Sequence, residues 1–316
     1  MSEVVASLEE LGIERGTVPA NGLELAYESI GDPTNPTMLM VMGLGAQLIT
    51  WPDPFVARLA AAGHHVVRFD NRDIGLSTHL DHLPVPPPVK AVLTRRPPYT
   101  IADMAADAHG LMDALDIERA DVVGASMGGF ISQTLALDHP ERVRSLTLIM
   151  TSTGSRRAGA IHPKVVAGML RRETTTTEEA YVRAGLATHA LIGNPGFPGD
   201  DEVVADLQRR LWARGYHPEG FARQFAAVVA QPDRTARLRK MDIPTLVVHG
   251  LSDPLVDPSG GRALARAIPH AKLVNYWGMG HSLPRALWDD ITGEILDHVA
   301  RVRGRAVTAM GADPVA

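Results

Sequence analysis

One serine in this sequence has the local setting of a nucleophile. Ser126 lies in the segment Gly124–Gly129, which reads Gly-Ala-Ser-Met-Gly-Gly and separates a strand-like run from a helical pattern. A serine on a sharp strand-to-helix turn needs neighbours without side chains two residues before and after it, because the strained turn packs closely against the core. The following helix start supplies backbone N–H groups and a positive dipole near a developing oxyanion. Ser126 is therefore the candidate nucleophile.

A nucleophilic serine needs a base, and the base needs a carboxylate that orients it. In this kind of sheet the acid and the base follow the serine, each on the loop after a later strand. Asp253 lies in the turn after one predicted strand, and His281 lies in a glycine-rich loop after the last one. Asp257 is the rival acid, and its alternative role is to cap a helix that has proline at its first position. We predict that Ser126, Asp253 and His281 form a catalytic triad.

An oxyanion intermediate needs a second N–H donor besides that of Met127, the residue after the nucleophile. The predicted strand Thr37–Gly43 ends in Met-Gly-Leu-Gly-Ala, where glycines allow the backbone to turn over the serine. We predict that the N–H groups of Leu44 and Met127 bind the oxyanion. The alternative is that these glycines only form a turn between strand and loop.

Short β-rich runs alternate with helical patterns, which predicts an α/β fold with a mostly parallel sheet flanked by helices. The run Leu23–Ser29 alternates polar and apolar residues and predicts an antiparallel edge strand. Thr100 is a good N-cap for a helix over Ile101–Leu115, with Asp103 as its acidic third residue. The other predicted strands are Thr37–Gly43, His64–Asp70, Ala120–Ala125, Ser145–Thr151, Pro244–His249 and Lys272–Tyr276, and the other core helices are Pro54–Ala62 and Leu287–Val302.

Residues 153–240 contain helical patterns but no convincing strand, and a simple crossover needs far fewer residues. We predict that they form an inserted helical cap, while residues 1–152 and 241–302 form the core. Residues 303–316 lack periodicity and predict a disordered tail. The proline-rich residues 78–98 predict an extended loop. The predicted cap helices are Pro163–Arg171, Thr177–Leu191, Asp200–Ala213 and Pro218–Ala230.

Composition excludes several classes of protein and of site. The chain has 316 residues, 45% hydrophobic, which suffices for a sizeable core. Its net charge of −5, without a long basic run, argues against nucleic acid as a partner. The absence of cysteine excludes disulfides and thiolate chemistry. The apolar runs are too short for a membrane span, and the acidic amino terminus does not resemble a secretory signal, so we expect a cytoplasmic protein. The oligomeric state does not follow from the sequence.

The histidines outside the predicted triad do not predict a metal site. His64 and His65 open a strand, while His79 and His82 lie in the proline-rich segment. Neither pair comes with the spacing of His and carboxylate ligands that a metal needs. We therefore expect no metal at these histidines.

These motifs together resemble the α/β-hydrolase superfamily, over roughly Gly22–Val302. Within it, the chain is similar to aclacinomycin methylesterase-like serine carboxylesterases. The segments that carry the superfamily resemblance are Met42–Gly45, Gly124–Gly128, His249–Asp253 and Gly280–His281, and those that carry the narrower one are Val41–Gly43, Trp51-Pro52, Asp70–Asp73 and Gly124–Gly128.

The resemblance implies a serine-esterase mechanism without a cofactor, with the oxyanion bound by Leu44 and Met127. It also implies that the charged segment Asp70–Ser77 fixes loops by hydrogen bonds. Many members have histidine where this chain has Met42. Because backbone N–H groups form the oxyanion hole, this difference need not abolish activity.

The expected reaction is hydrolysis of a small to medium carboxylic ester through an acyl-enzyme. Alternatives on the same triad are lactone or thioester hydrolysis, acyl transfer and cofactor-free peroxyacid formation. Epoxide or haloalkane hydrolysis is disfavoured, since on this fold it usually places Asp where Ser126 stands. An alternative of another class is a ligand-binding protein that uses the pocket without turnover.

Overall fold

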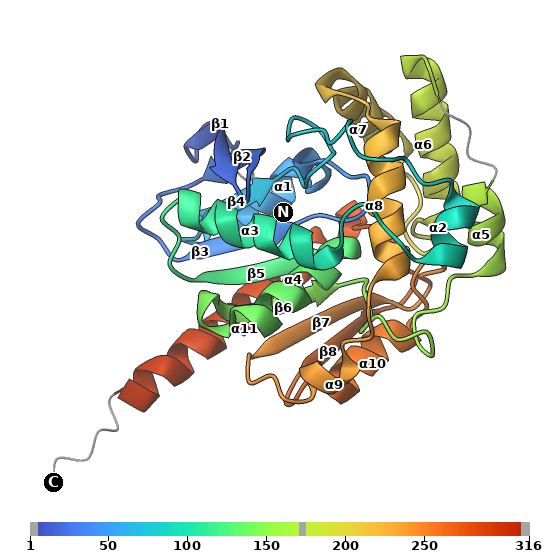
Figure 1. The fold of residues 1–316 in the computed structure, drawn as a ribbon. Coiled ribbons are helices and arrows are strands. Elements are labelled where there is room, and N and C mark those ends of the chain that lie inside the picture. Colours follow the sequence, from blue (N-terminus) through green and yellow to red (C-terminus); the bar gives the residue numbers. More distant parts are fainter. Residues whose placement is uncertain (1–5, 171–174, 311–316) are drawn as a thin grey trace, which may run out of the picture.

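A single sheet organises the structure. The computed structural model describes residues 6–170 and 175–310, and its strands follow the order β1-β2-β4-β3-β5-β6-β7-β8 across the sheet (Figure 1). The pairs β1–β2 and β2–β4 are antiparallel, and all other neighbours are parallel. The strands are β1 (Ile13–Ala20), β2 (Leu23–Ile30), β3 (Thr37–Val41), β4 (His65–Phe69), β5 (Ala120–Ala125), β6 (Val143–Ile149), β7 (Thr245–Gly250) and β8 (Lys272–Tyr276).

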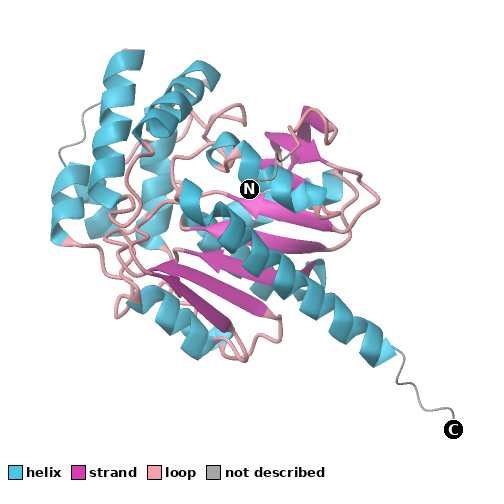
Figure 2. Cartoon of the chain, turned by 180° about the vertical axis from the view of Figure 1, so that it is seen from behind, coloured by secondary structure: helices cyan, strands magenta, loops and turns pink. Residues whose placement is uncertain are grey.

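Helices cover both faces of this sheet (Figures 1 and 2). In β3, Leu39 and Val41 pack on the α3–α4–α10 side, while Met38 and Met40 pack on the α1–α11 side. A strand buried on both faces is apolar throughout, which is typical of parallel sheets. The helices are α1 (Asp53–Ala61), α2 (Pro88–Thr94), α3 (Ile101–Ala114), α4 (Met127–Asp138), α5 (Pro163–Leu170), α6 (Glu178–Ile192), α7 (Asp201–Arg214), α8 (Pro218–Ala230), α9 (Thr235–Leu238), α10 (Ser259–Ala267) and α11 (Trp288–Met310), with short 3₁₀ turns at Leu48–Thr50, Pro140–Arg142 and Arg285–Leu287.

The predicted fold class is confirmed, and most of the predicted elements begin and end within two residues of their observed bounds. Helix α3 has the predicted cap: Thr100 Oγ1 accepts from the N–H of Asp103, whose carboxylate accepts from the N–H of Thr100. Helices α5 to α8 lie between β6 and β7 in the chain, within the segment predicted to be a helical cap (residues 153–240), for which we keep the name cap. Among the described helices, none combines the length and the hydropathy that crossing a lipid bilayer requires.

The amino-terminal hairpin differs from the prediction. The strand predicted at the edge of the sheet, Leu23–Ser29, lies within β2 and has neighbours on both sides, because β1 forms the edge instead. Asn21 and Gly22 connect the two strands with φ values of 50° and 77°, the backbone of a two-residue hairpin turn. Gly16 and Pro19 weaken the strand pattern of β1, and both residues are tolerated at a sheet edge.

The proline-rich segment 78–98 was predicted to be an extended loop, but part of it forms helix α2. Pro88 stands at the first position of this helix, where a missing N–H costs nothing and the fixed φ favours the helical turn. Figure 1 shows α2 beside α8, at the side of the cap.

The closing helix is longer than predicted, since α11 continues to Met310 and therefore includes part of the predicted tail. Arg303 explains the extension. Its guanidinium donates to Asp121 Oδ2 and to His64 Nδ1, both at 3.2 Å, which ties this turn of the helix to the core. Residues 311–316 of the predicted tail lie outside the described residues.

The cap is joined to the core by two buried ion pairs. Arg223 of α8 donates to both carboxylate oxygens of Asp73 at 2.9 Å, and the two side chains are 1% and 0% exposed. Arg214 of α7 donates to the fully buried carboxylate of Asp70 at 2.9 Å. Burial opposes ionisation of Asp73, but its hydrogen bonds to Arg223 and to the N–H of Leu80 lower its pKa. The charged segment after β4 was expected to fix loops by hydrogen bonds, and in the structure it also attaches the cap, which was not expected.

Replacing Arg223 by Met should destabilise the protein by about 3–5 kcal/mol, because Asp73 would remain buried without its partner. Urea unfolding at neutral pH measures this loss. The difference from the unmodified protein should shrink as the pH falls through the lowered pKa of Asp73, where the carboxylate becomes protonated in both proteins.

Arg237→Met is the matched control, since the pair Arg237–Asp138 lies at the surface with side chains 55% and 40% exposed. Such a pair contributes about 0–1 kcal/mol. Equal losses in the two variants would show that the Arg223–Asp73 pair does not hold the cap.

Candidate active site

Ser126 occupies a strained turn between β5 and α4. Its φ of 54° and ψ of −117° lie in a region that non-glycine residues rarely adopt. Hydrogen bonds hold this backbone on two sides. The N–H of Ser126 donates to the carbonyl of Ile149 at 3.0 Å, and its own carbonyl accepts from Thr151 Oγ1 at 2.8 Å. The hydroxyl is thereby presented at the carboxyl edge of the sheet.

The glycines around Ser126 are required by close backbone contacts. A Cβ at Gly128 would collide with the carbonyl oxygen of Val41, and one at Gly124 would collide with Ser132 and with the backbone of Gly128. A Cβ at Gly43 would lie 3.1 Å from Ser126 Cβ. These contacts bring the end of β3 directly against the nucleophile, which explains the Gly-x-Ser-x-Gly spacing physically.

His281 and Asp253 meet Ser126 although they lie far away in the sequence. His281 Nε2 is 3.0 Å from Ser126 Oγ, and His281 Nδ1 is 2.7 Å from Asp253 Oδ2. With the proton on Nδ1, the ring donates to the carboxylate and accepts from the serine hydroxyl. Asp253 is buried, and its other oxygen accepts from the N–H groups of Leu255 and Val256 at 2.9 and 2.8 Å.

The rival acid, Asp257, does not reach the imidazole. Its side chain is 50% exposed, and its Oδ1 accepts from the N–H of Ser259 at 2.8 Å, at the start of α10. Although partial burial opposes the shift, the hydrogen bonds from Ser259 lower the pKa of Asp257. The structure therefore gives Asp257 the capping role and places Asp253 beside His281.

A second histidine, His249, lies beside Asp253, but its hydrogen bond stabilises the loop that carries Asp253. His249 is fully buried, and its Nε2–H donates to the carbonyl of Val256 at 2.8 Å. Burial lowers the pKa of His249, which keeps the ring neutral. His249 thus closes the turn that carries the acid.

The loop that carries Leu44 is fixed from two directions. The carbonyl of Met42 accepts from the side-chain amide of Asn71 at 3.0 Å. Gln224 of α8, which is fully buried, accepts from the N–H of Gly45 at 2.9 Å and donates to the carbonyl of Arg72 at 2.8 Å. Leu44 stands between these two attachments, directly after the glycine that touches Ser126.

Met127 is buried at the first position of α4. Met127 directly follows Ser126, and Leu44 directly follows Gly43, whose backbone lies against Ser126. An acyl-transfer intermediate requires a preorganised pair of N–H groups, and that Leu44 and Met127 supply them stays a prediction.

A cluster of His79, Asp81 and His217 joins the loop after β4 to the start of α8, with ligand-type atoms within 4.8 Å of one another. The two imidazole rings are stacked, with centroids 3.9 Å apart and planes 8° from parallel, so no ion can lie in both ring planes. The guanidinium of Arg223 is 3.0 Å from His217 Nε2 and 3.3 Å from Asp81 Oδ1. This donor set does not suit a metal ion and instead strengthens the contact between core and cap.

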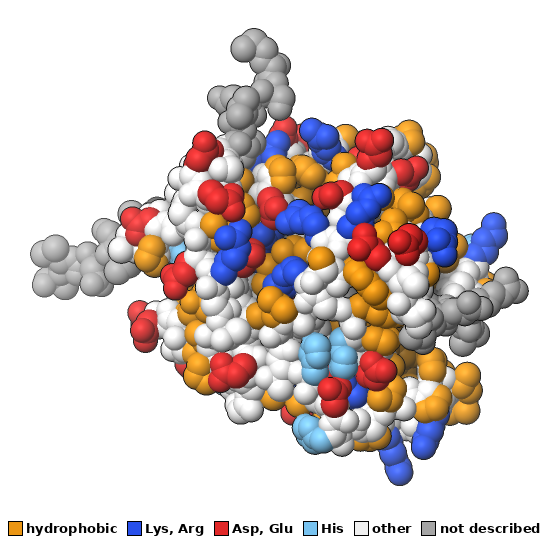
Figure 3. Space-filling model, turned by 90° about the horizontal axis from the view of Figure 1, so that it is seen from above, with side chains coloured by type: hydrophobic (Ala, Val, Ile, Leu, Met, Phe, Trp, Pro, Cys, Tyr) orange, Lys and Arg blue, Asp and Glu red, His pale blue; other side chains and the backbone are white. Residues whose placement is uncertain are grey.

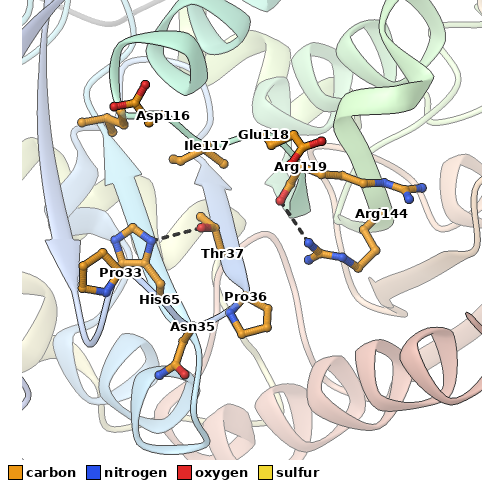
Figure 4. A pocket seen from close by; sticks show the side chains of 11 residues that line it. Pro33, Asn35, Pro36, Thr37, His65, Asp116, Ile117, Glu118, Arg119 and Arg144 are labelled. Atoms are coloured by element: carbon orange, nitrogen blue, oxygen red, sulfur yellow. Dashed lines mark hydrogen bonds between the residues drawn. The ribbon is translucent and has the colours of Figure 1, made fainter. Parts of the chain in front are cut away.

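A pocket of about 190 Å³ lies at the opposite edge of the sheet, where β3, β4 and β5 begin (Figure 4). Its polar side chains bind one another or the nearby backbone. His65 lies 3.1 Å from Thr37 Oγ1, and Arg144 donates to the carbonyl of Arg119 at 3.1 Å. The pocket is separate from the edge that carries Ser126.

Sequence reasoning missed two cap residues that contact the site. These are Gln224, described above, and Asn194, which bonds to the loop of His281. Asn194 belongs to the segment Gly193-Asn-Pro-Gly196, which indicates a turn and nothing more. Gln224 lies in α8, and the apolar periodicity of this helix does not indicate that one of its polar residues is buried.

Comparisons with known proteins agree with this geometry. The model of the α/β hydrolase fold family matches residues 36–284. Rhodomycin D methylesterase DauP from Streptomyces sp. strain C5 is 32% identical, over 86% of this chain and 93% of the relative. The predicted resemblance to methylesterases is thus confirmed.

Solved structures agree as well. The enol-lactonase from Burkholderia xenovorans LB400 is 28% identical with a TM-score of 0.69, and the match covers 90% of this chain and 100% of the other. A thermophilic esterase from Thermogutta terrifontis is 25% identical with a TM-score of 0.69, and covers 92% and 99%. The sheet, the strained serine turn and these relatives together show that the chain belongs to the α/β hydrolase fold family.

Proposed function

We propose that this protein is a serine hydrolase of carboxylic esters, with Ser126 as nucleophile, His281 as general base and acid, and Asp253 as orienting carboxylate. The observation that carries the proposal is the continuous hydrogen-bond chain from Ser126 Oγ through His281 to Asp253. The similarity to rhodomycin D methylesterase indicates the substrate class, since hydrolysis of a methyl ester is hydrolysis of a carboxylic ester and releases methanol.

The chemistry proceeds in two halves. Ser126 Oγ attacks the ester carbonyl carbon while His281 Nε2 takes its proton, and the N–H groups of Leu44 and Met127 hold the oxyanion. Collapse of this intermediate breaks the bond to the alcohol oxygen, which receives the proton from His281. Water then attacks the acyl-enzyme in the same way, releasing the carboxylic acid and restoring the serine.

The cap forms the roof over this site. Phe221 of α8 packs so closely on Gly45 that a Cβ there would enter its ring. Tyr181, Trp212 and Tyr216 instead pack on one another, with centroids 4.9 to 5.6 Å apart, and form the cap's own core. Phe221 therefore places an apolar side chain beside the loop that carries Leu44, in keeping with a small to medium ester as substrate.

The surface around the cap is mixed in character. On the face drawn in Figure 3, acidic and basic side chains alternate with apolar ones. A lipase that works at an oil–water interface needs a broad apolar surface instead. We propose that the substrate reaches the site as a dissolved molecule.

Two alternatives remain distinct from this proposal. Lactone hydrolysis would use the same triad, and the similar enol-lactonase structure favours its inclusion among candidate reactions. A ligand-binding role without turnover would use the same pocket. Sustained release of nitrophenol from a p-nitrophenyl ester would rule out ligand binding without turnover. Rates on a panel of esters, lactones and thioesters distinguish ester hydrolysis from lactone hydrolysis.

Replacing Ser126 by Ala should lower kcat by about 10⁶-fold, with His281→Ala similar and the double variant hardly worse, because the residues act as a unit. The measurement is steady-state turnover of a soluble p-nitrophenyl ester. Fluorophosphonate labelling followed by peptide mapping provides the control, and a label on any residue other than Ser126 would contradict the assignment.

Asp253→Asn should lower kcat by about 10⁴-fold, because the imidazole loses its orientation. Asp257→Asn is a matched control that alters the same turn, and it should cost little, since this side chain only caps α10. The reverse order of the two effects would transfer the acid role to Asp257.

Rates on p-nitrophenyl esters from acetate to palmitate should be highest at short to medium acyl length, without a jump beyond the solubility limit. The mixed surface of Figure 3 is the reason, since it offers no broad apolar face for an oil–water interface. A preference for palmitate with activation at the emulsion interface would make the enzyme a lipase.

A further inference from the structure

We infer that Asn194 of the cap is a positioning residue for His281, so that the cap forms part of the catalytic machinery as well as a roof. The inference rests on the proposed role of His281. Asn194 lies in the turn between α6 and α7, and its side chain is buried against the loop between β8 and α11.

Asn194 uses both ends of its amide on the residues that flank the histidine. Its Oδ1 accepts from the N–H of Gly280 at 2.9 Å, and its Nδ2 donates to Ser282 Oγ at 2.7 Å. The carbonyl of Ile192, two residues earlier, accepts from the N–H of His281 itself at 2.7 Å. Two consecutive N–H groups of the histidine loop are thus bound by one turn of the cap.

Glycines allow this contact to be very close. A Cβ at Gly280 would collide with the carbonyl of Gly193, and a Cβ at Gly196 would lie 2.7 Å from the Cα of Gly278. The N–H of Gly196 also donates to the carbonyl of Gly278 at 3.0 Å. The two turns therefore meet backbone to backbone, and neither can shift without the other.

On its other side the histidine loop contacts the turn that carries the acid. The N–H of Ser252 donates to the carbonyl of Met279 at 2.9 Å. The loop is held between the acid turn of the core and the Asn194 turn of the cap. Of these two supports, Asn194 supplies the side-chain contacts to Gly280 and Ser282, the residues immediately before and after the imidazole.

The test compares Asn194→Ala and Asn194→Asp in the full chain. The alanine variant should lose roughly 10- to 100-fold in kcat with KM changed less than about twofold, because displacing a catalytic group by 1 Å can cost about 10²-fold. Its rate of phosphonylation by a fluorophosphonate should fall to a similar extent. Each rate is divided by the concentration of sites that the fluorophosphonate labels at saturation. This removes misfolded protein from the comparison, because only folded protein is labelled.

The aspartate variant keeps an acceptor for Gly280 and can accept from the hydroxyl of Ser282, so it should recover much of the rate. Recovery of the rate by aspartate, which has nearly the same shape as asparagine, attributes the loss in the alanine variant to the hydrogen bonds. A merely structural role would leave the phosphonylation rate per labelled site unchanged in both variants.

Asn275→Ala is the matched control, since Asn275 is exposed on β8 in the same segment and its side chain makes no hydrogen bond among the described residues. Ser282→Ala removes only one of the two amide contacts and should cost less than Asn194→Ala. The inference is overturned if Asn194→Ala keeps the phosphonylation rate of Asn275→Ala, or if the aspartate variant is as slow as the alanine variant.

These outcomes are separable from the proposed function. If the unmodified protein labels at Ser126 but turns over no ester, lactone or thioester, the proposed function fails. The phosphonylation rates of the variants still report on the position of His281 in that case.

Discussion

The backbone of Ser126 is the constraint on which the rest of the site depends. A φ of 54° with ψ of −117° is tolerated only because the surrounding contacts determine it. Gly128 makes one of these contacts, since it lets α4 begin against the carbonyl of Val41. The hydroxyl then stands above the sheet edge, where its partners must reach it from other strands.

The sheet order decides how far these partners must reach. Ser126 follows β5, Asp253 follows β7 and His281 follows β8, three strand positions away from the serine. At about 4.8 Å per strand, the histidine loop has to extend back over roughly 14 Å of sheet. A loop of this reach leaves the support of its own strand, and the cap turn at Asn194 provides a second support. The position of His281 is therefore tied to the docking of the cap.

The core part of the site could be predicted because its residues follow from turn chemistry and chain order. Gly124 and Gly128 mark the serine turn, and the glycine-rich loop marks His281. Asp253 was predicted over Asp257 from its place in the turn after β7, and in the structure Asp253 lies within hydrogen-bond distance of His281, whereas Asp257 is half exposed. The strand β1 was missed because its glycine and proline obscured an alternating pattern, although the Asn-Gly turn beside it is typical of a hairpin.

The cap contacts could not be predicted for a different reason. Asn194 and Gln224 act through tertiary hydrogen bonds to loops 86 and 179 residues away, which leave no periodicity in the local sequence. The same holds for the ion pair that Arg223 makes with Asp73, 150 residues distant. Local patterns fix which segments are helices, whereas the partner of a buried polar side chain depends on how those helices dock.

The way the cap docks on the core also determines which of its residues can be substituted at low cost to the fold. Phe221 and Gln224 are three residues apart on α8 and therefore share one face of the helix, which packs on the oxyanion loop through Gly45. Arg223 lies between them and carries the buried ion pair. A substitution on this stretch of α8 would disturb the oxyanion loop or the attachment of the cap. Helix α6 has no fully buried residue among those described, so its side chains can vary at lower cost to the fold. Exposed positions of α6 should therefore tolerate substitution more readily than this stretch of α8.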